Sequence, residues 1–341
     1  FADVEGTRII VFYPKDGVSR VQELQMLTQK GANTSVVGIS GNFDDAQSGV
    51  KKIFGDKEFA KELAGRGYQL SSANSINIGR LVPQVVYYVY AYAKLLENGE
   101  IENGEKINVT VPTGNFGNIL AAYFAKQMGV PIDKLICASN DNKVLYDFFK
   151  TGVYDKNRPF ILTSSPSMDI LISSNLERLI YLSTGCDAEE TKKRMEELSK
   201  DGKYSVTGEM RARMADFVGG YADQAANAAE IKRLYDETGY MIDTHTGVAS
   251  CVYHNYVKET GDTKKTVIAS TASPYKFSRS VMEAIFGSEE GKGEFELIDE
   301  MEKASGVKIP QAIEEIRKAE IRHNRQCKPE EMEKTVSEIL Q

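Results

Sequence analysis

Segments typical of β-strands alternate with segments typical of α-helices along most of the chain. TRIIVFYP (7–14) is apolar and β-branched, GVSRVQELQMLTQKG (17–31) has apolar residues at helical spacing, and TSVVGIS (34–40) has the composition of the next strand. Strands joined by helices of this length pair in parallel through right-handed crossovers. The alternation therefore predicts an α/β fold with parallel sheets flanked by helices.

A second stretch of the same kind begins with a long apolar segment, 81–96, which contains Gln84 and Lys94. A membrane span needs about 20 nearly uninterrupted apolar residues, so this segment predicts a buried helix instead. INVTV (107–111) and residues 134–138 have strand composition, with a helix expected between them over 118–128. The chain from 265 to 286 repeats the order strand, loop, helix.

Two domains are expected for a chain of 341 residues with this pattern. We predict a small α/β domain over 1–77 and a large α/β domain over 78–341 that ends in a charged, helical tail from Gly287. The chain starts at Phe1, in a segment that reads as a helix end running into a strand. We therefore expect the small domain to be incomplete, with an N-terminal part missing.

Composition excludes several classes of function. The net charge of −7 argues against binding to nucleic acid or to an anionic membrane, because both require basic patches. The four cysteines have no CxxC spacing and the three histidines have no metal-ligand spacing, so no metal site is predicted. Dispersed cysteines and the lack of a recognisable signal peptide favour a cytoplasmic location.

The stretch PTGNFGN (112–118) follows a predicted strand and precedes a predicted helix. Free backbone N–H groups at a helix start form an anion site, and glycines such as Gly114 and Gly117 let an anion approach the main chain. The spacing matches neither the dinucleotide fingerprint nor a P-loop. A single phosphate is the predicted ligand, and a tight turn without a ligand is the alternative.

Four further segments accompany this loop, and the set has a recognisable order. SANSINIGR (72–80), PTGNFGN, SPSMDILISSNLERL (165–179), DTHTGVA (243–249) and STASPYKF (270–277) together resemble threonine synthase. That family consists of pyridoxal-phosphate enzymes with the tryptophan-synthase-β-like fold, called fold type II. The resemblance implies conversion of O-phosphohomoserine and water to threonine and phosphate, a step of threonine biosynthesis, by a monomer or homodimer.

The resemblance also implies residue roles. Thr271 matches the hydroxyl residue at the cofactor's pyridine nitrogen, and Arg80 is the expected partner of the substrate phosphate, a surface salt bridge being the alternative. Ser75 and Asn77 match a segment facing the active cleft, with a turn or N-cap role equally open. DTHTGVA is better read as a polar cap of the following helix. The residues matched to the cofactor's phosphate are Gly114, Asn115, Phe116, Gly117 and Asn118.

The resemblance places the Schiff-base lysine in a phenylalanine–lysine–aspartate segment upstream of Phe1, and this sequence contains no such segment. We therefore assign no catalytic residue and expect the chain by itself to be inactive. Two alternatives stay open: another fold type II enzyme, of the threonine dehydratase or cysteine synthase class, or a non-catalytic, threonine-synthase-like protein that binds phosphate.

Overall fold

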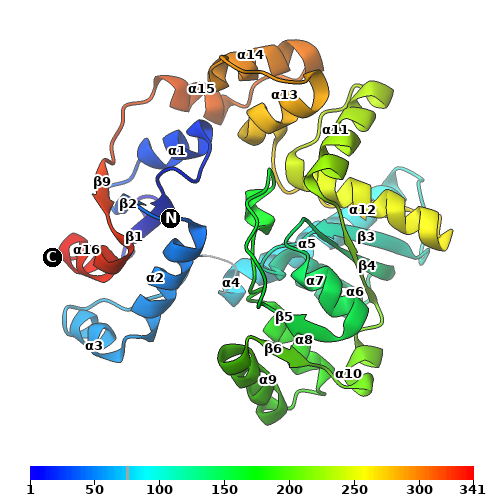
Figure 1. Cartoon of the computed structure of the whole chain (residues 1–341), viewed down its shortest axis with the longest axis horizontal. Coiled ribbons are helices and arrows are strands. Elements are labelled where there is room, and N and C mark those ends of the chain that lie inside the picture. The colour runs from blue at the N-terminus through cyan, green and yellow to red at the C-terminus, as the bar shows by residue number, and fades with distance from the viewer. Residues whose placement is uncertain (74–76) are drawn as a thin grey trace. The chain divides into compact units, whose positions relative to one another are not determined.

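The computed structural model describes residues 1–73 and 77–341, without the side chains of residues 43 and 44. The chain forms two compact units (Figure 1). The first unit contains Phe1–Ser71, Tyr275–Arg279 and Glu289–Gln341, and the second contains Ser72–Pro274 and Ser280–Ser288. The chain passes between the units through the short helix η3 (Pro274–Phe277) and α13 (Ser278–Phe286).

The first unit is built on a three-stranded parallel sheet in the order β1-β2-β9. Its core contains Val37 and Ile39 of β2, Leu63 of α3, and Met332 of α16, all at most 5% exposed. Parallel pairing of the first two strands confirms the prediction from the alternating pattern. The elements are β1 (Ile9–Pro14), α1 (Arg20–Leu27), β2 (Thr34–Ile39), α2 (Phe43–Gly55), α3 (Lys57–Gly65), α14 (Glu294–Ser305), α15 (Gln311–Lys318), β9 (Arg325–Cys327), η4 (Pro329–Glu331) and α16 (Met332–Ile339).

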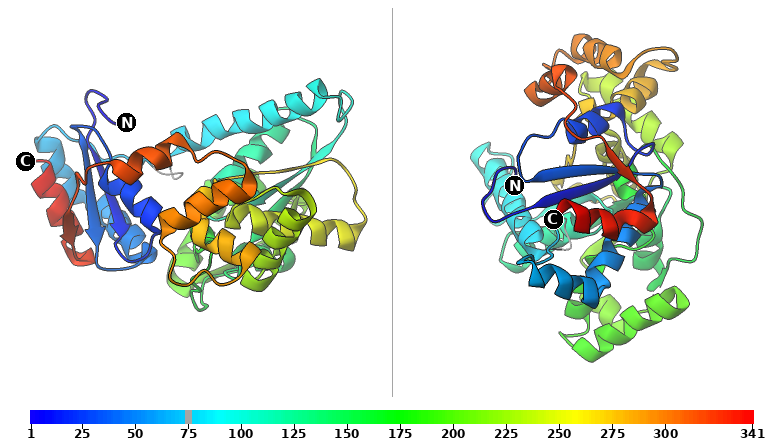
Figure 2. Two further views of the ribbon diagram at one scale, coloured as in Figure 1. Left: turned by 90° about the horizontal axis from the view of Figure 1, so that it is seen from above. Right: turned by 90° about the vertical axis from the view of Figure 1, so that its left-hand side faces the viewer.

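The C-terminal tail differs from the prediction, which placed it in the large domain. Strand β9 pairs with β2, with Val37 opposite Arg325 and Ile39 opposite Cys327. Figure 2 shows β9 and α16 beside β1 and β2, although almost the whole sequence separates them. The expected assignment of 78–341 to one domain is therefore corrected. A three-residue strand carries too little periodicity to be recognised from sequence.

The second unit contains a four-stranded parallel sheet in the order β7-β4-β3-β8 and a two-stranded antiparallel ribbon, β5-β6. Its strands are β3 (Ile107–Pro112), β4 (Ile132–Ser139), β5 (Val153–Asp155), β6 (Lys203–Ser205), β7 (Phe217–Tyr221) and β8 (Thr266–Ile268). Its helices are α4 (Ile78–Leu81), η1 (Val82–Gln84), α5 (Val85–Glu97), α6 (Gly117–Gln127), α7 (Val144–Thr151), η2 (Pro166–Met168), α8 (Leu176–Ser183), α9 (Ala188–Asp201), α10 (Gly208–Arg213), α11 (Gln224–Thr238) and α12 (Thr244–Thr260).

Helices cover both faces of the four-stranded sheet, and successive residues of its central strands face opposite cores. Leu135 and Cys137 of β4 pack with α5, α6 and α7, whereas Ile136 and Ala138 of the same strand pack with α12. This is the side-chain alternation expected of a strand buried on both faces. The carboxyl end of β3 leads through residues 113–116 into the first turn of α6.

Helix α5 is less buried than the sequence predicts. Val85, Tyr88 and Tyr92 are less than 10% exposed, but Val86 and Tyr90 are more than 60% exposed. The apolar composition of the segment therefore does not correspond to burial on all sides in this chain. Of the helices in the described residues, none is long and apolar enough to cross a membrane.

Candidate active site

The glycine loop connects β3 to α6, and a strained residue turns the chain between them. Phe116 has a left-handed backbone, with φ of 66°, which is uncommon for a residue other than glycine. Its ring is 1% exposed and packs against Phe149 and Phe217 at centroid distances of 6.0 and 5.6 Å. Burial of this ring stabilises a backbone conformation that costs about 1–3 kcal/mol.

The carbonyl groups of the loop are held by the segment that precedes α8. The Ser173 hydroxyl donates to the Gly114 carbonyl at 2.7 Å. The backbone N–H and the side-chain amide of Asn175 both donate to the Asn115 carbonyl, at 3.1 and 2.9 Å. In a trans peptide the N–H points away from the preceding carbonyl. The N–H groups of Asn115 and Phe116 therefore point away from the 173–175 segment.

The backbone N–H groups of residues 114–118 have no acceptor among the described residues. They lie at the N-terminus of α6, which has no side-chain cap, and the loop lines a cavity of about 450 Å³. Unpaired N–H groups at the positive end of a helix attract an anion. The donors of this loop fit a phosphate group, and binding of that ligand stays a prediction, with a turn without a ligand as the alternative.

Gly114 is needed for close packing between the loop and η2. A Cβ added at this residue would clash with the backbone carbonyl oxygen of Ser167 in η2. Backbone atoms cannot move aside as a flexible side chain can, so the loop and η2 touch only because residue 114 is glycine. The segment SPSM (165–168) thus packs against the loop at Gly114.

Asn118 is oriented by a buried tyrosine. Its side-chain oxygen accepts a hydrogen bond from the Tyr88 hydroxyl of α5. Because the oxygen is used in this way, the NH₂ group of the same amide remains a donor. Burial raises the pKa of Tyr88, so the phenol stays protonated as a donor across the physiological range. No sequence pattern indicates this pair, since 29 residues separate its members in the chain and no motif connects them.

Thr271 lies in a second cavity, of about 360 Å³, next to the first. Asn118 and Tyr87 line both cavities, and Ser270 and Thr271 line the second. The loop predicted to hold the cofactor's phosphate and the residue predicted to contact its ring nitrogen are thus in one neighbourhood. Among the residues that line these two cavities there is no lysine.

The predicted substrate residues have different surroundings. Arg80 lines the larger cavity together with the glycine loop, donates to the Ala73 carbonyl at 2.5 Å and forms no ion pair with any described residue. Asn77 caps α4, accepting from the Gly79 N–H at 2.9 Å and donating to the Ser72 carbonyl. Its contact with substrate remains a prediction beside this capping role. Ser75 lies outside the described residues.

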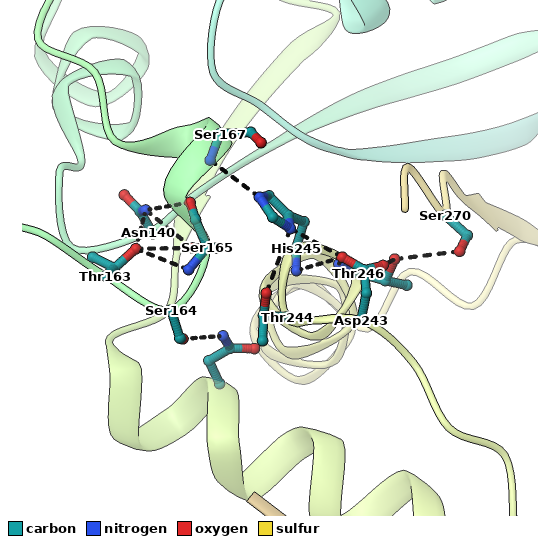
Figure 3. Close-up of polar contacts among 11 residues, drawn as sticks. Asn140, Thr163, Ser164, Ser165, Ser167, Asp243, Thr244, His245, Thr246 and Ser270 are labelled. Carbon is teal, nitrogen blue, oxygen red and sulfur yellow. Dashed lines mark hydrogen bonds and ion pairs between the residues drawn. The ribbon is translucent and has the colours of Figure 1, made fainter. Parts of the chain in front are cut away.

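The DTHTGVA segment caps α12, as expected, and also makes contacts that sequence reasoning missed. Asp243 accepts from the N–H groups of His245 and Thr246. His245 contacts both Asp243 and the N–H of Ser167 (Figure 3). Burial raises the pKa of Asp243, but hydrogen bonds from His245 and Thr246 outweigh it and lower the pKa overall. This carboxylate is therefore charged at neutral pH although it is fully buried.

A second polar cluster fixes the chain just before η2. The Asp169 carboxylate accepts from the side-chain amides of Asn140 and Asn142 and from the N–H and hydroxyl of Thr163. Asn140 also donates to the Ser165 hydroxyl. Burial raises the pKa of Asp169 in spite of these hydrogen bonds. The cluster orders the segment that leads into Ser167, whose residues do not line the cavity of the glycine loop.

Comparisons with known proteins identify relatives of this chain. The model of a family described as "Threonine synthase, C-terminal" matches residues 246–335. The chain is 41% identical to threonine synthase-like 1 of Homo sapiens over 286 residues, covering 83% of this chain and 38% of that protein. It is 35% identical to threonine synthase of Saccharomyces cerevisiae over 316 residues, covering 88% of this chain and 60% of that protein.

Solved structures give the same result. The pyridoxal-phosphate-bound threonine synthase of Brucella melitensis matches 99% of this chain with a TM-score of 0.81 and 32% identity, over 66% of its own length. The yeast threonine synthase structure matches with the same TM-score and 30% identity, covering 98% of this chain and 65% of that one. The fold is thus that of the fold type II pyridoxal-phosphate enzymes.

The chain belongs to the threonine synthase family. It spans 38% of the length of the human relative and 60% of the length of the yeast relative.

Proposed function

We propose that the protein to which this chain belongs is a threonine synthase, which converts O-phosphohomoserine and water to threonine and phosphate. The observation that supports this most is the glycine loop, whose five N–H groups lack acceptors among the described residues and line a cavity with Arg80. Family membership supplies the reaction class. A cytoplasmic location, a role in threonine biosynthesis and a monomeric or homodimeric state are parts of the same proposal.

Pyridoxal phosphate is the proposed cofactor, and the residues present fit it. When bound, it supplies an electron sink for charge that develops beside the substrate's amino group. In our proposal the N–H groups of residues 114–118 hold its phosphate, with the Asn118 side-chain NH₂ as a further donor. The hydroxyl of Thr271 contacts the ring nitrogen. A hydroxyl is neutral, so it orients the ring without placing a negative charge beside that nitrogen.

Arg80 is the proposed partner of the substrate phosphate. A planar guanidinium can bind two phosphate oxygens at once, and the guanidinium of Arg80 donates only one hydrogen bond to a described residue. Because it lines the same cavity as the loop, the cavity presents two separate groups for anions: neutral N–H donors and one cation. The substrate and the cofactor each carry a phosphate, and this pair of sites accounts for both.

The cofactor site is tested by Gly117→Val. A branched Cβ at the first residue of α6 would project into the approach of the phosphate. We expect affinity for pyridoxal phosphate, measured by fluorescence titration, to fall by at least about tenfold, while affinity for pyridoxal, which lacks the phosphate, stays the same. Equal affinity of wild type and variant for pyridoxal phosphate would show that the loop is only a turn.

Turnover is tested separately. The purified chain is incubated with pyridoxal phosphate and O-phosphohomoserine, phosphate release is measured, and borohydride reduction followed by mass spectrometry maps any lysine linked to the cofactor. We expect scattered, substoichiometric labelling and no phosphate release from this chain, but release by the full-length protein. Stoichiometric labelling of one lysine here, with turnover, would overturn the assignment of that lysine to a segment outside this chain.

A second candidate is a threonine-synthase-like protein that binds phosphate without catalysis. It is favoured by one comparison: the chain is 41% identical to threonine synthase-like 1 of Homo sapiens and 35% identical to the threonine synthase of Saccharomyces cerevisiae. The two candidates differ in one result. A full-length protein that binds pyridoxal phosphate but releases no phosphate from O-phosphohomoserine would favour the second candidate.

A further inference from the structure

The first turn of α12 contacts two neighbours of the groups that the proposed function assigns to the cofactor. His245 reaches Ser167 of η2, the segment packed behind Gly114. One residue further, the Thr246 hydroxyl lies 3.4 Å from the hydroxyl of Ser270, the neighbour of Thr271 (Figure 3). A single helix start therefore touches the support of the phosphate loop and the loop that carries the ring-nitrogen residue.

The hydrogen bonds of His245 define which of its ring nitrogens carries the proton. The backbone N–H of Ser167 can only donate, and it points to Nε2 at 3.2 Å. Nε2 must therefore be unprotonated to accept. Nδ1 then carries the proton and donates it to the Asp243 carboxylate at 3.0 Å. The neutral imidazole, with this one tautomer, links Asp243 to Ser167.

Burial makes this link rigid. Asp243 is 0% exposed and His245 is 3% exposed, so water does not compete for either partner. Asp243 is held in turn by the N–H groups at the start of α12. Ser167 cannot shift without losing its contact to His245, and its carbonyl oxygen lies against the Cα of Gly114. The position of the phosphate loop therefore depends on the start of α12.

We propose that His245 is a positioning residue for the phosphate loop: it holds η2 against Gly114 and so keeps the N–H groups of residues 114–118 directed into their cavity. This inference rests on the proposed function for the identity of the ligand, but the positioning itself concerns only the protein. His245 does not line either cavity, so it acts through Ser167 and not by touching the cofactor.

A matched pair of variants tests the proposal. In His245→Asn the shorter amide can still donate to Asp243 but cannot reach Ser167. In His245→Gln the longer side chain can place its oxygen near the position of Nε2 and accept from Ser167. Loss of one buried hydrogen bond weakens an interaction by about tenfold. We expect affinity for pyridoxal phosphate to fall about tenfold in His245→Asn and less than about threefold in His245→Gln.

Amide hydrogen exchange of the unliganded protein provides a second readout that needs no ligand. We expect exchange of the Ser167 and Asn175 amides to accelerate about tenfold in His245→Asn only, with the C-terminal half of α12 unchanged in both variants. Unchanged exchange and affinity in His245→Asn would overturn the proposal. Equal losses in both variants would also overturn it, because they would indicate that the imidazole only fills space.

Nitrogen NMR of the wild type tests the proposal if neither variant folds. We expect the ¹⁵N shifts of His245 to show a protonated Nδ1 and an unprotonated Nε2, and a protonated Nε2 would contradict the link to Ser167. A wild type that binds no pyridoxal phosphate would overturn the proposed cofactor role. In that case the exchange of Ser167 and Asn175 would still decide the role of His245.

Discussion

At the scale of single residues, the glycine loop has two sides with different partners. Its carbonyl groups at Gly114 and Asn115 accept hydrogen bonds from Ser173 and Asn175, whereas its N–H groups have no acceptor among the described residues. This asymmetry is what the proposed function uses, since a loop with all donors paired would offer none to an anion. Phe116 maintains it by packing its ring into the core.

Gly114→Ala tests the packing behind the loop. The added methyl group would clash with the Ser167 carbonyl, and we expect the free energy of unfolding to fall by about 1–3 kcal/mol, as for overpacking in a core. Urea denaturation measures this change. Gly208→Ala is the control, because a Cβ at Gly208 meets no atom within 4 Å. Equal stability of the two variants would contradict the contact between the loop and η2.

Residue-level prediction from sequence succeeded where a local motif carries the information. The composition of residues 114–118 indicated free N–H groups, and the polar DTHTGVA segment indicated a cap of the following helix, which the structure assigns to Asp243. The pairs Tyr88–Asn118 and His245–Ser167 were not predicted, because each joins segments far apart in the chain and depends on the packing of helices. No local pattern contains that information.

At the scale of elements, the loop between α12 and β8 is attached to the central strand β3. The Asp262 carboxylate accepts from the buried side chain of Asn108 at 3.0 Å and from the Tyr256 hydroxyl at 2.9 Å. Burial raises the pKa of Asp262, but hydrogen bonds from Asn108, from the Lys264 backbone and from Tyr256 outweigh it and lower the pKa well below its usual range.

This attachment predicts an acid dependence of stability. The pKa of Asp262 is lower in the folded chain than the value of about 3.9 for an unfolded chain, so its contribution is fully present above that value. It is lost as the pH falls below about 4 toward the folded-state pKa. We expect Asp262→Asn to lower the free energy of unfolding by about 1–3 kcal/mol at pH 7 and to flatten its decline below pH 4, measured by urea denaturation.

The control for that measurement is Asp236→Asn, which breaks an exposed ion pair with Lys232 on α11. Such pairs contribute about 0–1 kcal/mol to stability. The free energy of unfolding of this variant should therefore match that of the wild type at pH 7 and below pH 4. A pH profile of Asp262→Asn that parallels wild type would show that the carboxylate does not tie the loop to β3.

The elements themselves were largely predictable, with differences at β9 and α5. Strands β1, β2, β3 and β4 and helix α6 agree with the sequence pattern to within about four residues, because each has clear periodicity or a flanking glycine or proline. The sequence predicted α5 as a buried helix, but one face carries exposed Val86 and Tyr90. An apolar composition shows that a helix can be buried. Which of its faces are buried depends on the other segments that pack against it.

At the scale of the whole molecule, the two units draw on different parts of the sequence. The first unit combines the N-terminal 71 residues with the C-terminal segment from Glu289, which the sequence pattern had assigned to the second. Met332 illustrates why: it is 1% exposed in the core of the first unit, and its side chain fills the space above Gly49 of α2. Sequence order alone cannot show that a chain returns to its first sheet.

Met332→Ala tests this assignment. Removing a fully buried methionine side chain leaves a cavity and costs about 2–5 kcal/mol. We expect hydrogen exchange to accelerate in residues 1–71 and 289–341 and to stay unchanged in β3 and β4. Met128→Ala, at a methionine that is 73% exposed, is the control. Acceleration in β3 and β4 but not in β1 and β2 would place the tail with the second unit.

The measurement that tests the central claim most directly is an NMR titration of ¹⁵N-labelled protein with pyridoxal phosphate and, separately, with pyridoxal. If the loop holds the cofactor's phosphate, the amide signals of residues 114–118 move strongly with pyridoxal phosphate and little with pyridoxal, because the new hydrogen bonds are made by the phosphate oxygens. Unmoved signals for these five amides at saturating pyridoxal phosphate would contradict the account.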